Sequence, residues 1–152
     1  IKSIKMADAG ASLVKPVKAG DLKKGSHVLI KGCPCKVVEV TTSKTGKHGH
    51  AKANITALDI FTGNKLMDIS PTSHNMEEPF VTNLNYTIID IGEEGFATLI
   101  DEAGETREDL KLDESNTNAR HAELIKTFQD AGEVNVKVVK AMGMEMIFPV
   151  TG

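Results

Sequence analysis

The segment Cys35-Lys36-Val37-Val38-Glu39-Val40-Thr41-Thr42 decides how this part of the chain folds, because its β-branched residues favour a strand. It runs directly into Ser43-Lys44-Thr45-Gly46-Lys47-His48-Gly49-His50-Ala51-Lys52, a stretch with no large apolar side chain, and a second strand-like run, Ala53-Asn54-Ile55-Thr56-Ala57, follows. A polar stretch between two strands is predicted to form a hairpin tip that projects into solvent. Gly46 and Gly49 let the backbone turn on either side of Lys47 and His48, which is expected to place Lys47 near the apex.

Further short β runs flank this hairpin. Val28-Leu29-Ile30 lies before it, with a turn predicted at Gly32-Cys33-Pro34, and Lys65-Leu66-Met67-Asp68-Ile69 lies after it. About five short strands with tight turns indicate a small barrel or sandwich. The acidic, proline-containing stretch from Ser73 to Phe80 has weak periodicity, so a domain boundary is expected near residues 79–83.

A second set of β runs and one helix follow that boundary. The helix is predicted from Asn118 to Ala131, with Thr117 or Asn118 as its cap and Gly132 at its end. This order fits a five-stranded OB-type barrel, although the pattern alone also allows other small α+β folds. The strands are predicted at residues 86–91, 96–100, 134–139 and 144–148, and the buried face of the helix at Leu124, Ile125 and Phe128.

Charge is divided unevenly along the 152 residues. Residues 1–83 hold 12 Lys, no Arg and 7 acidic residues, whereas residues 84–152 hold 6 basic and 14 acidic residues. The first part, at net +5, is suited to phosphate backbones, and the second, at net −8, is expected to avoid them. No run of 18 or more apolar residues appears, so no membrane partner is expected. A cytoplasmic location is predicted because the two cysteines are expected to be reduced thiols.

Cys33 and Cys35 lack the third and fourth ligands of a zinc set and are predicted to be reduced thiols. Residues 1–13 are expected to be disordered or left over from expression.

Several chemistries compete for the stretch around Lys47. A Walker-type phosphate loop is excluded because Thr41 stands where its first glycine would be and no Ser or Thr follows Lys47. A metal site would have His48 and His50 as its nearby ligands and would need His74 to be brought in by the fold. A catalytic lysine needs a desolvated pocket, which an exposed tip does not provide, so an enzyme is not expected. Spacing alone leaves open a solvated basic hairpin with no special role and a contact with a nucleic-acid backbone.

Five stretches together resemble the family of eukaryotic translation initiation factor 5A, the relative of bacterial elongation factor P. The resemblance covers about residues 20–142, and its longest motif is the hypusination loop of that family at residues 42–52. The other matching stretches are Lys31-Gly32 with Pro34-Cys35-Lys36, Asp59-Ile60-Phe61-Thr62-Gly63, Ser73-His74-Asn75-Met76 and Arg107-Glu108-Asp109-Leu110.

The resemblance implies a mostly β fold, with an SH3-like barrel at residues 14–82 that bears the loop and an OB-fold domain with one helix at residues 83–152. It implies that Lys47 becomes hypusine through deoxyhypusine synthase and deoxyhypusine hydroxylase, with no bound cofactor and no metal. The factor would bind the ribosome and support the P-site transfer RNA beside ribosomal RNA, which promotes peptide bonds at proline runs and termination. A general RNA-binding barrel and OB module without modification is the alternative. Residues expected to support Lys47 or to contact RNA or the synthase are Lys44, Thr45, Gly46, His48, Gly49, His50 and Lys52.

Overall fold

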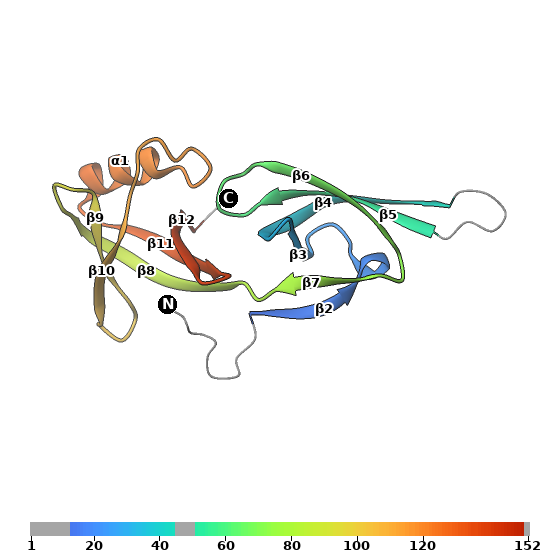
Figure 1. Cartoon of the computed structure of the whole chain (residues 1–152). Helices are drawn as coiled ribbons and strands as arrows, with labels where there is room; N and C mark the ends of the chain where they lie inside the picture. Colours follow the sequence, from blue (N-terminus) through green and yellow to red (C-terminus); the bar gives the residue numbers. More distant parts are fainter. Residues whose placement is uncertain (1–12, 45–50, 151–152) are drawn as a thin grey trace. The chain divides into compact units, whose positions relative to one another are not determined.

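The computed structural model describes residues 13–44 and 51–150, and the chain divides into two compact units, residues 1–80 and 81–152 (Figure 1). The predicted junction between residues 82 and 83 lies two residues beyond this division. The described residues are mostly β with one α-helix, which confirms the predicted fold class.

The first unit contains two antiparallel sheets. Four strands lie in the order β3–β4–β5–β6, and β2 pairs with β7. The core under these sheets is formed by apolar side chains that alternate along the strands, such as Ile55 and Ala57 of β5. The bounds are β2 Val14–Lys18, a 3₁₀ turn η2 Ala19–Asp21, β3 His27–Ile30, β4 Cys33–Lys44, β5 Ala51–Asp59, β6 Lys65–Pro71 and β7 Asn75–Pro79.

One sequence-based prediction for this unit is wrong, and strand β7 was missed. The turn after β3 is formed by Lys31 and Gly32, which both have positive φ (53° and 78°), so Cys33 and Pro34 already belong to β4. Such a two-residue turn matches the twist of the paired strands. Strand β7 was not predicted, because its partner β2 lies about 60 residues earlier in the chain and left no local signal. The boundary was expected near residues 79–83, and the two units divide after residue 80.

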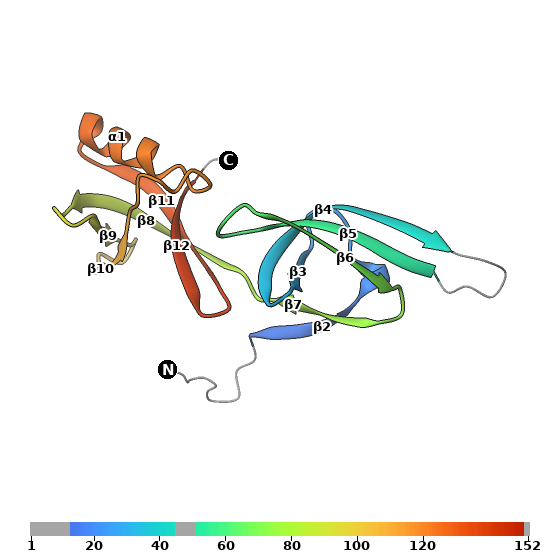
Figure 2. The same ribbon diagram turned by 45° about the horizontal axis from the view of Figure 1, so that its top comes forward.

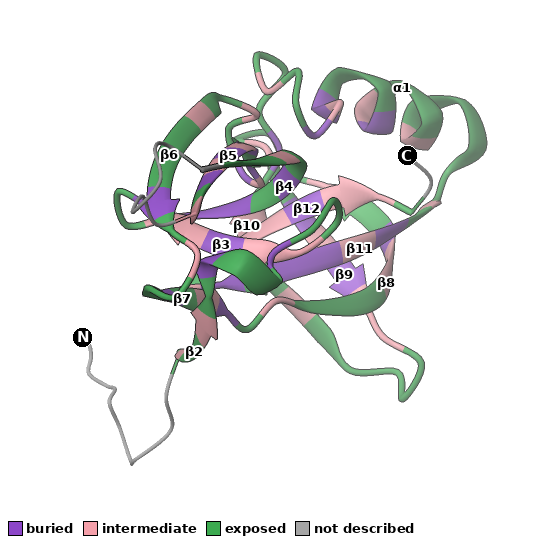
Figure 3. Ribbon diagram, turned by 90° about the vertical axis from the view of Figure 1, so that its right-hand side faces the viewer, coloured by how far each residue is buried: buried purple, intermediate pink, exposed green. Residues whose placement is uncertain are grey.

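The second unit is a five-stranded antiparallel sheet in the order β10–β9–β8–β11–β12, with α1 packed at its core. Figure 3 shows the buried positions of these strands in purple. Leu124, Ile125 and Phe128 of α1 join the core, as predicted, beside Ile88 and Leu99. The bounds are β8 Thr82–Ile91, β9 Phe96–Ile100, β10 Thr106–Lys111, α1 His121–Ala131, β11 Val134–Ala141 and β12 Met144–Pro149.

Helix α1 begins three residues later than predicted. Asn116 replaces Thr117 and Asn118 as the polar group at this end, because its side-chain oxygen accepts the N–H of Ala119 at 2.9 Å. His121, 2% exposed, accepts the N–H of Asp113 at Nδ1 (2.9 Å), and its Nε2 lies 2.8 Å from the carbonyl oxygen of Ile147. Gly132 ends the helix as predicted, with φ 81° and its N–H donated to the carbonyl of Phe128.

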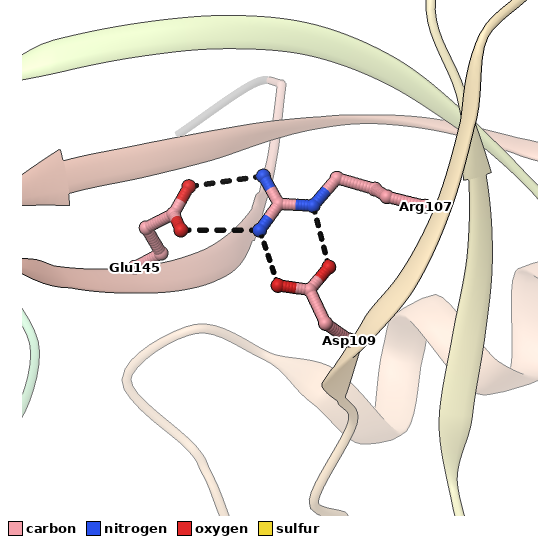
Figure 4. Close-up of polar contacts among 3 residues, drawn as sticks. All are labelled: Arg107, Asp109 and Glu145. Carbon is pink, nitrogen blue, oxygen red and sulfur yellow. Dashed lines mark hydrogen bonds and ion pairs between the residues drawn. The ribbon is translucent and has the colours of Figure 1, made fainter.

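An arginine joins the two edge strands of the second sheet (Figure 4). Arg107 of β10 donates to both carboxylate oxygens of Glu145 on β12, at 3.0 and 3.1 Å, and to both oxygens of Asp109 at 2.6 Å. Its guanidinium carbon also lies 5.9 Å from the ring centre of Tyr86. Because β10 and β12 share no ladder of backbone hydrogen bonds, Arg107 supplies a side-chain link between the two edges.

Candidate functional site

The candidate site lies where β4 and β5 meet the stretch that contains Lys47. The two strands are paired antiparallel as far as Ser43 opposite Lys52 and Lys44 opposite Ala51, and Figure 2 shows them side by side up to the grey trace. Asn54 donates across the pair to the carbonyl of Thr41 at 3.4 Å and to the hydroxyl of Ser43 at 3.3 Å. The β4–β5 ladder therefore fixes both ends of the intervening six residues at one strand end.

Most of the predicted site residues lie in those six. Lys47, with Thr45, Gly46, His48, Gly49 and His50, lies outside the described residues, so its predicted presentation stays a prediction. The backbone of Lys44 ends β4, and Lys52 is exposed on β5.

The first residue of β5, Ala51, is hydrogen-bonded to the loop that follows β6, a contact that the sequence did not reveal. The N–H of Thr72 donates to the carbonyl of Ala51 (3.0 Å), and the carbonyl of Thr72 accepts the N–H of Gly20 (2.9 Å). A Cβ on Gly20 would lie 3.0 Å from the Cβ of Thr72, so a side chain there would displace this loop. The carbonyl of His74 also accepts the N–H of Ala19 (2.9 Å), which ties the same loop to η2.

The hydrogen bonds from Ala19 and Gly20 join residues more than 50 positions apart, and the signal that could have located them was the Ser73-His74-Asn75-Met76 motif. That motif begins within the loop, and Met76 is buried in the core.

Lysines without close acidic partners dominate the surface of the first unit. Among the described residues of this unit, one lysine forms an ion pair, Lys15 with Glu78 at 4.0 Å. The described lysines are all exposed: Lys15, Lys18, Lys23, Lys24, Lys31, Lys36, Lys52 and Lys65. A surface of unpaired ammonium groups favours polyanions and should bind them with a strong dependence on salt.

Within residues 13–44 and 51–150, no three His, Cys, Asp or Glu side chains are grouped as metal ligands. Because His48 and His50 are outside these ranges, this finding does not bear on the histidine pair considered above. In the same ranges, no helix has the length and apolar character needed to cross a bilayer. Cys35 is buried, and burial, followed by the nearby Asp59, raises the pKa of its thiol to about 11, which suppresses its reactivity.

Two family models together match nearly the whole chain. Residues 12–74 match the model described as "Translation initiation factor 5A-like, N-terminal", and residues 80–150 match "Eukaryotic elongation factor 5A hypusine, DNA-binding OB fold".

Similar proteins carry the same description. The chain is 50% identical over 141 residues to eukaryotic translation initiation factor 5A-3 of Arabidopsis thaliana, covering 93% of this chain and 88% of that protein. Among solved structures, it resembles a translation initiation factor eif-5a family protein from Naegleria fowleri, with a TM-score of 0.79 and 56% identity over 90% of this chain and 96% of that one. Eukaryotic translation initiation factor 5A from Methanococcus jannaschii gives a TM-score of 0.67 at 29% identity, over 90% of this chain and 94% of that chain.

Proposed function

Because the chain belongs to the translation initiation factor 5A family and is therefore a translation factor, we propose that it acts on the ribosome through a hypusine formed on Lys47. The observation that carries this proposal is the position of Lys47 within a matched domain, in a motif that resembles the hypusination loop of the family. The paired strand ends at Lys44 and Ala51 support it, because they give the motif a fixed base.

The modification is made by two enzymes that take this protein as substrate. Deoxyhypusine synthase, using NAD, transfers an aminobutyl group from spermidine to the ε-amine of Lys47, and deoxyhypusine hydroxylase then adds a hydroxyl group. The product is a longer side chain with a second cationic amine and additional hydrogen-bond donors. In this proposal Gly46 and Gly49 shape the turn, and His48 contributes to recognition by the synthase or to the RNA contact.

The extended side chain suits a narrow cleft with RNA walls. We expect it to lie beside the P-site transfer RNA and ribosomal RNA, where it orients the acceptor end for slow peptide bonds at proline runs and for termination. Lys44, Lys52 and the exposed lysines of the first unit would neutralise phosphates around it. His50 is assigned to the same loop surface, and the factor would work in the cytoplasm.

Mass spectrometry of the protein from its native cells tests the modification directly. The peptide that contains Lys47 should carry the aminobutyl and hydroxyl groups, while the peptide that contains Lys65 should be unmodified. An unmodified Lys47 in actively growing cells would refute the hypusine proposal and favour an unmodified RNA-binding module.

Translation of a messenger with consecutive proline codons tests the mechanism. Lys47→Arg keeps one positive charge but removes the amine that the synthase uses, so rescue of the proline stall should be lost. Lys65→Arg changes an exposed lysine on β6 in the same way and should retain rescue. Equal rescue by both variants would exclude Lys47 as the acting residue.

A further inference from the structure

The outer face of β8, β9 and β10 in the second unit carries apolar side chains that the described residues cover only in part. Ala97 and Leu99 of β9 point into the core, so Phe96 and Ile100, which alternate with them, lie on the other face. Ile89 of β8 lies where the β8–β9 register shifts, and it is 42% exposed, while Phe96 is 41% exposed.

Helix α1 packs through Leu124, Ile125 and Phe128 with the core cluster and therefore lies on the inner side. The apolar side chains of the outer face are left to solvent or to a partner.

A cavity lies at the other end of this face. It has a volume of about 380 Å³, and its walls include Ile100, Asn85 and Asn135. An adjoining cavity of about 350 Å³ shares Asn85 and Glu102 with it, so the two form one groove.

The hydroxyl of Thr87 donates to the side-chain oxygen of Asn135 at 2.8 Å, which fixes that amide at the wall. The groove thus combines an apolar wall at Ile100 with amide groups able to bond a peptide backbone.

The charge around this face identifies the chemistry of its partner. Residues 82–111 contain eight acidic residues and two basic ones, Arg107 and Lys111. Arg107 is engaged by Asp109 and Glu145, and the ammonium of Lys111 lies 5.5 Å from the ring centre of Phe96. Exposed carboxylates at the edges of the strands are, in chain order, Asp90, Glu93, Glu94, Glu102 and Glu105. Such a surface repels phosphates and attracts cations.

We propose that the outer face of β8–β10 docks a basic, extended segment of a partner protein, with one aliphatic side chain against Phe96, another against Ile100, and Lys or Arg side chains beside the surrounding carboxylates. The four residue steps from Phe96 to Ile100 span about 13 Å at the rise of a strand, so about five residues of such a segment cover the apolar face. This site is distinct from the Lys47 site and does not rest on the proposed modification.

Fluorescence anisotropy with the full chain and a short labelled peptide in which arginine alternates with leucine tests this docking. The measurement is made at physiological ionic strength, where charges more than about 8 Å away are screened. Reversal of Glu94 and Glu102 together to lysine should weaken binding about tenfold or more, because two attractions become repulsions. The matched reversal of Glu114 and Glu133, which lie outside this face, should change the affinity less than about twofold.

The apolar part of the proposal has its own variants. Phe96→Ser, and separately Ile89→Thr, should weaken the peptide without affecting the transition monitored by Tyr86 fluorescence. Lys47→Arg should bind the peptide like the unaltered chain.

Equal weakening by the two reversal pairs would overturn the proposal, because it would show that net charge alone draws the peptide. Binding of a uridine oligonucleotide that is lost in Phe96→Ser would also overturn it, because the face would then be a nucleic-acid site.

Discussion

Replacing Arg107 by methionine should destabilise the second unit by about 2 kcal/mol. The side chains of Arg107 and Glu145 are 23% and 24% exposed, and that of Asp109 is 62% exposed (Figure 4). Breaking a fully buried ion pair costs about 3–5 kcal/mol, whereas an exposed pair contributes about 0.2–1 kcal/mol. The link to Glu145 lies between these limits and dominates the loss, since Asp109 regains water when Arg107 is removed.

The composition of the chain allows each unit to be monitored separately. Tyr86 is the one tyrosine, no tryptophan is present, and Tyr86 belongs to the second unit, so intrinsic fluorescence monitors that unit. Cys33 and Cys35 are the two cysteines, and the burial of Cys35 makes its labelling a monitor of unfolding in the first unit.

With a urea dependence of about 1–2 kcal/mol/M, the Arg107→Met change should lower the midpoint of the fluorescence transition by about 1–2 M. The midpoint for thiol labelling should stay unchanged.

A second substitution separates the ion pair from the packing of the side chain. Glu145→Gln in the Arg107→Met background removes the unpaired carboxylate and should recover part of the loss. Asp109 adds a pH signature, because the hydrogen bonds from Arg107 lower its pKa below the ordinary value of 3.8. The contribution of Asp109 to the stability of the second unit is present above pH 4 and is lost as the pH falls through the lowered pKa. The difference in urea midpoint between Arg107→Met and the unaltered chain should therefore narrow in acid. A fluorescence midpoint within about 0.3 M of the unaltered chain at pH 7 would refute the link between the edge strands.

Three further changes test the first unit. Burial, followed by the charge of Lys36, lowers the pKa of His27 below 6.5, so this unit should lose stability as the pH falls from 6.5 through the lowered pKa. His27→Gln should make the stability depend less on pH, as measured by thiol labelling with a reagent active in acid. An unchanged pH dependence would contradict the role of His27. Gly20→Ala should cost about 1–3 kcal/mol because its Cβ meets Thr72, and an unchanged urea midpoint for thiol labelling would show that the loop yields freely. Asp68 accepts the N–H of Ile69 at 2.9 Å on the edge strand β6, where Met67 and Ile69 are 65% and 63% exposed. Its charge should protect this edge from pairing with another chain, so Asp68→Val should promote self-association in sedimentation velocity. A monomeric Asp68→Val variant beside a monomeric Asp68→Asn control would contradict this protection.

The sequence predicted the elements whose residues alternate or repeat locally. The strand runs around Val37, Ile55 and Leu99 are present, and the stripe of Leu124, Ile125 and Phe128 packs in the core. Strands β2 and β7 escaped prediction because each contains a proline and their pairing, Val14 with Pro79, is distant in sequence.

The start of α1 was misplaced for a related reason. The polar residues Thr117 and Asn118 look like caps, but the tertiary contacts of His121 with Asp113 and Ile147 accompany a later start. Local propensity could not reveal these contacts.

The candidate site divides in the same way. The prediction for Lys47 rests on a motif that is contiguous in the chain and stays a prediction, whereas the hydrogen bonds at Gly20, Ala51 and Thr72 depend on packing between distant segments. From residue spacing alone, a solvated basic hairpin with no special role and a contact with RNA were equally good interpretations of this stretch. The resemblance of the whole motif to a known family was needed to choose between them.

The unequal use of lysine and arginine in the two units has a physical consequence for binding. All basic residues of the first unit are lysines, which act as hydrated point charges suited to phosphates in many orientations. Arg107 of the second unit instead binds two carboxylates in fixed geometry. The two units should therefore bind opposite classes of partner, polyanions for the first and basic segments for the second. The acidic second unit repels polyanions, and the basic first unit repels basic segments. One chain can therefore bind both partners without competition for the same surface.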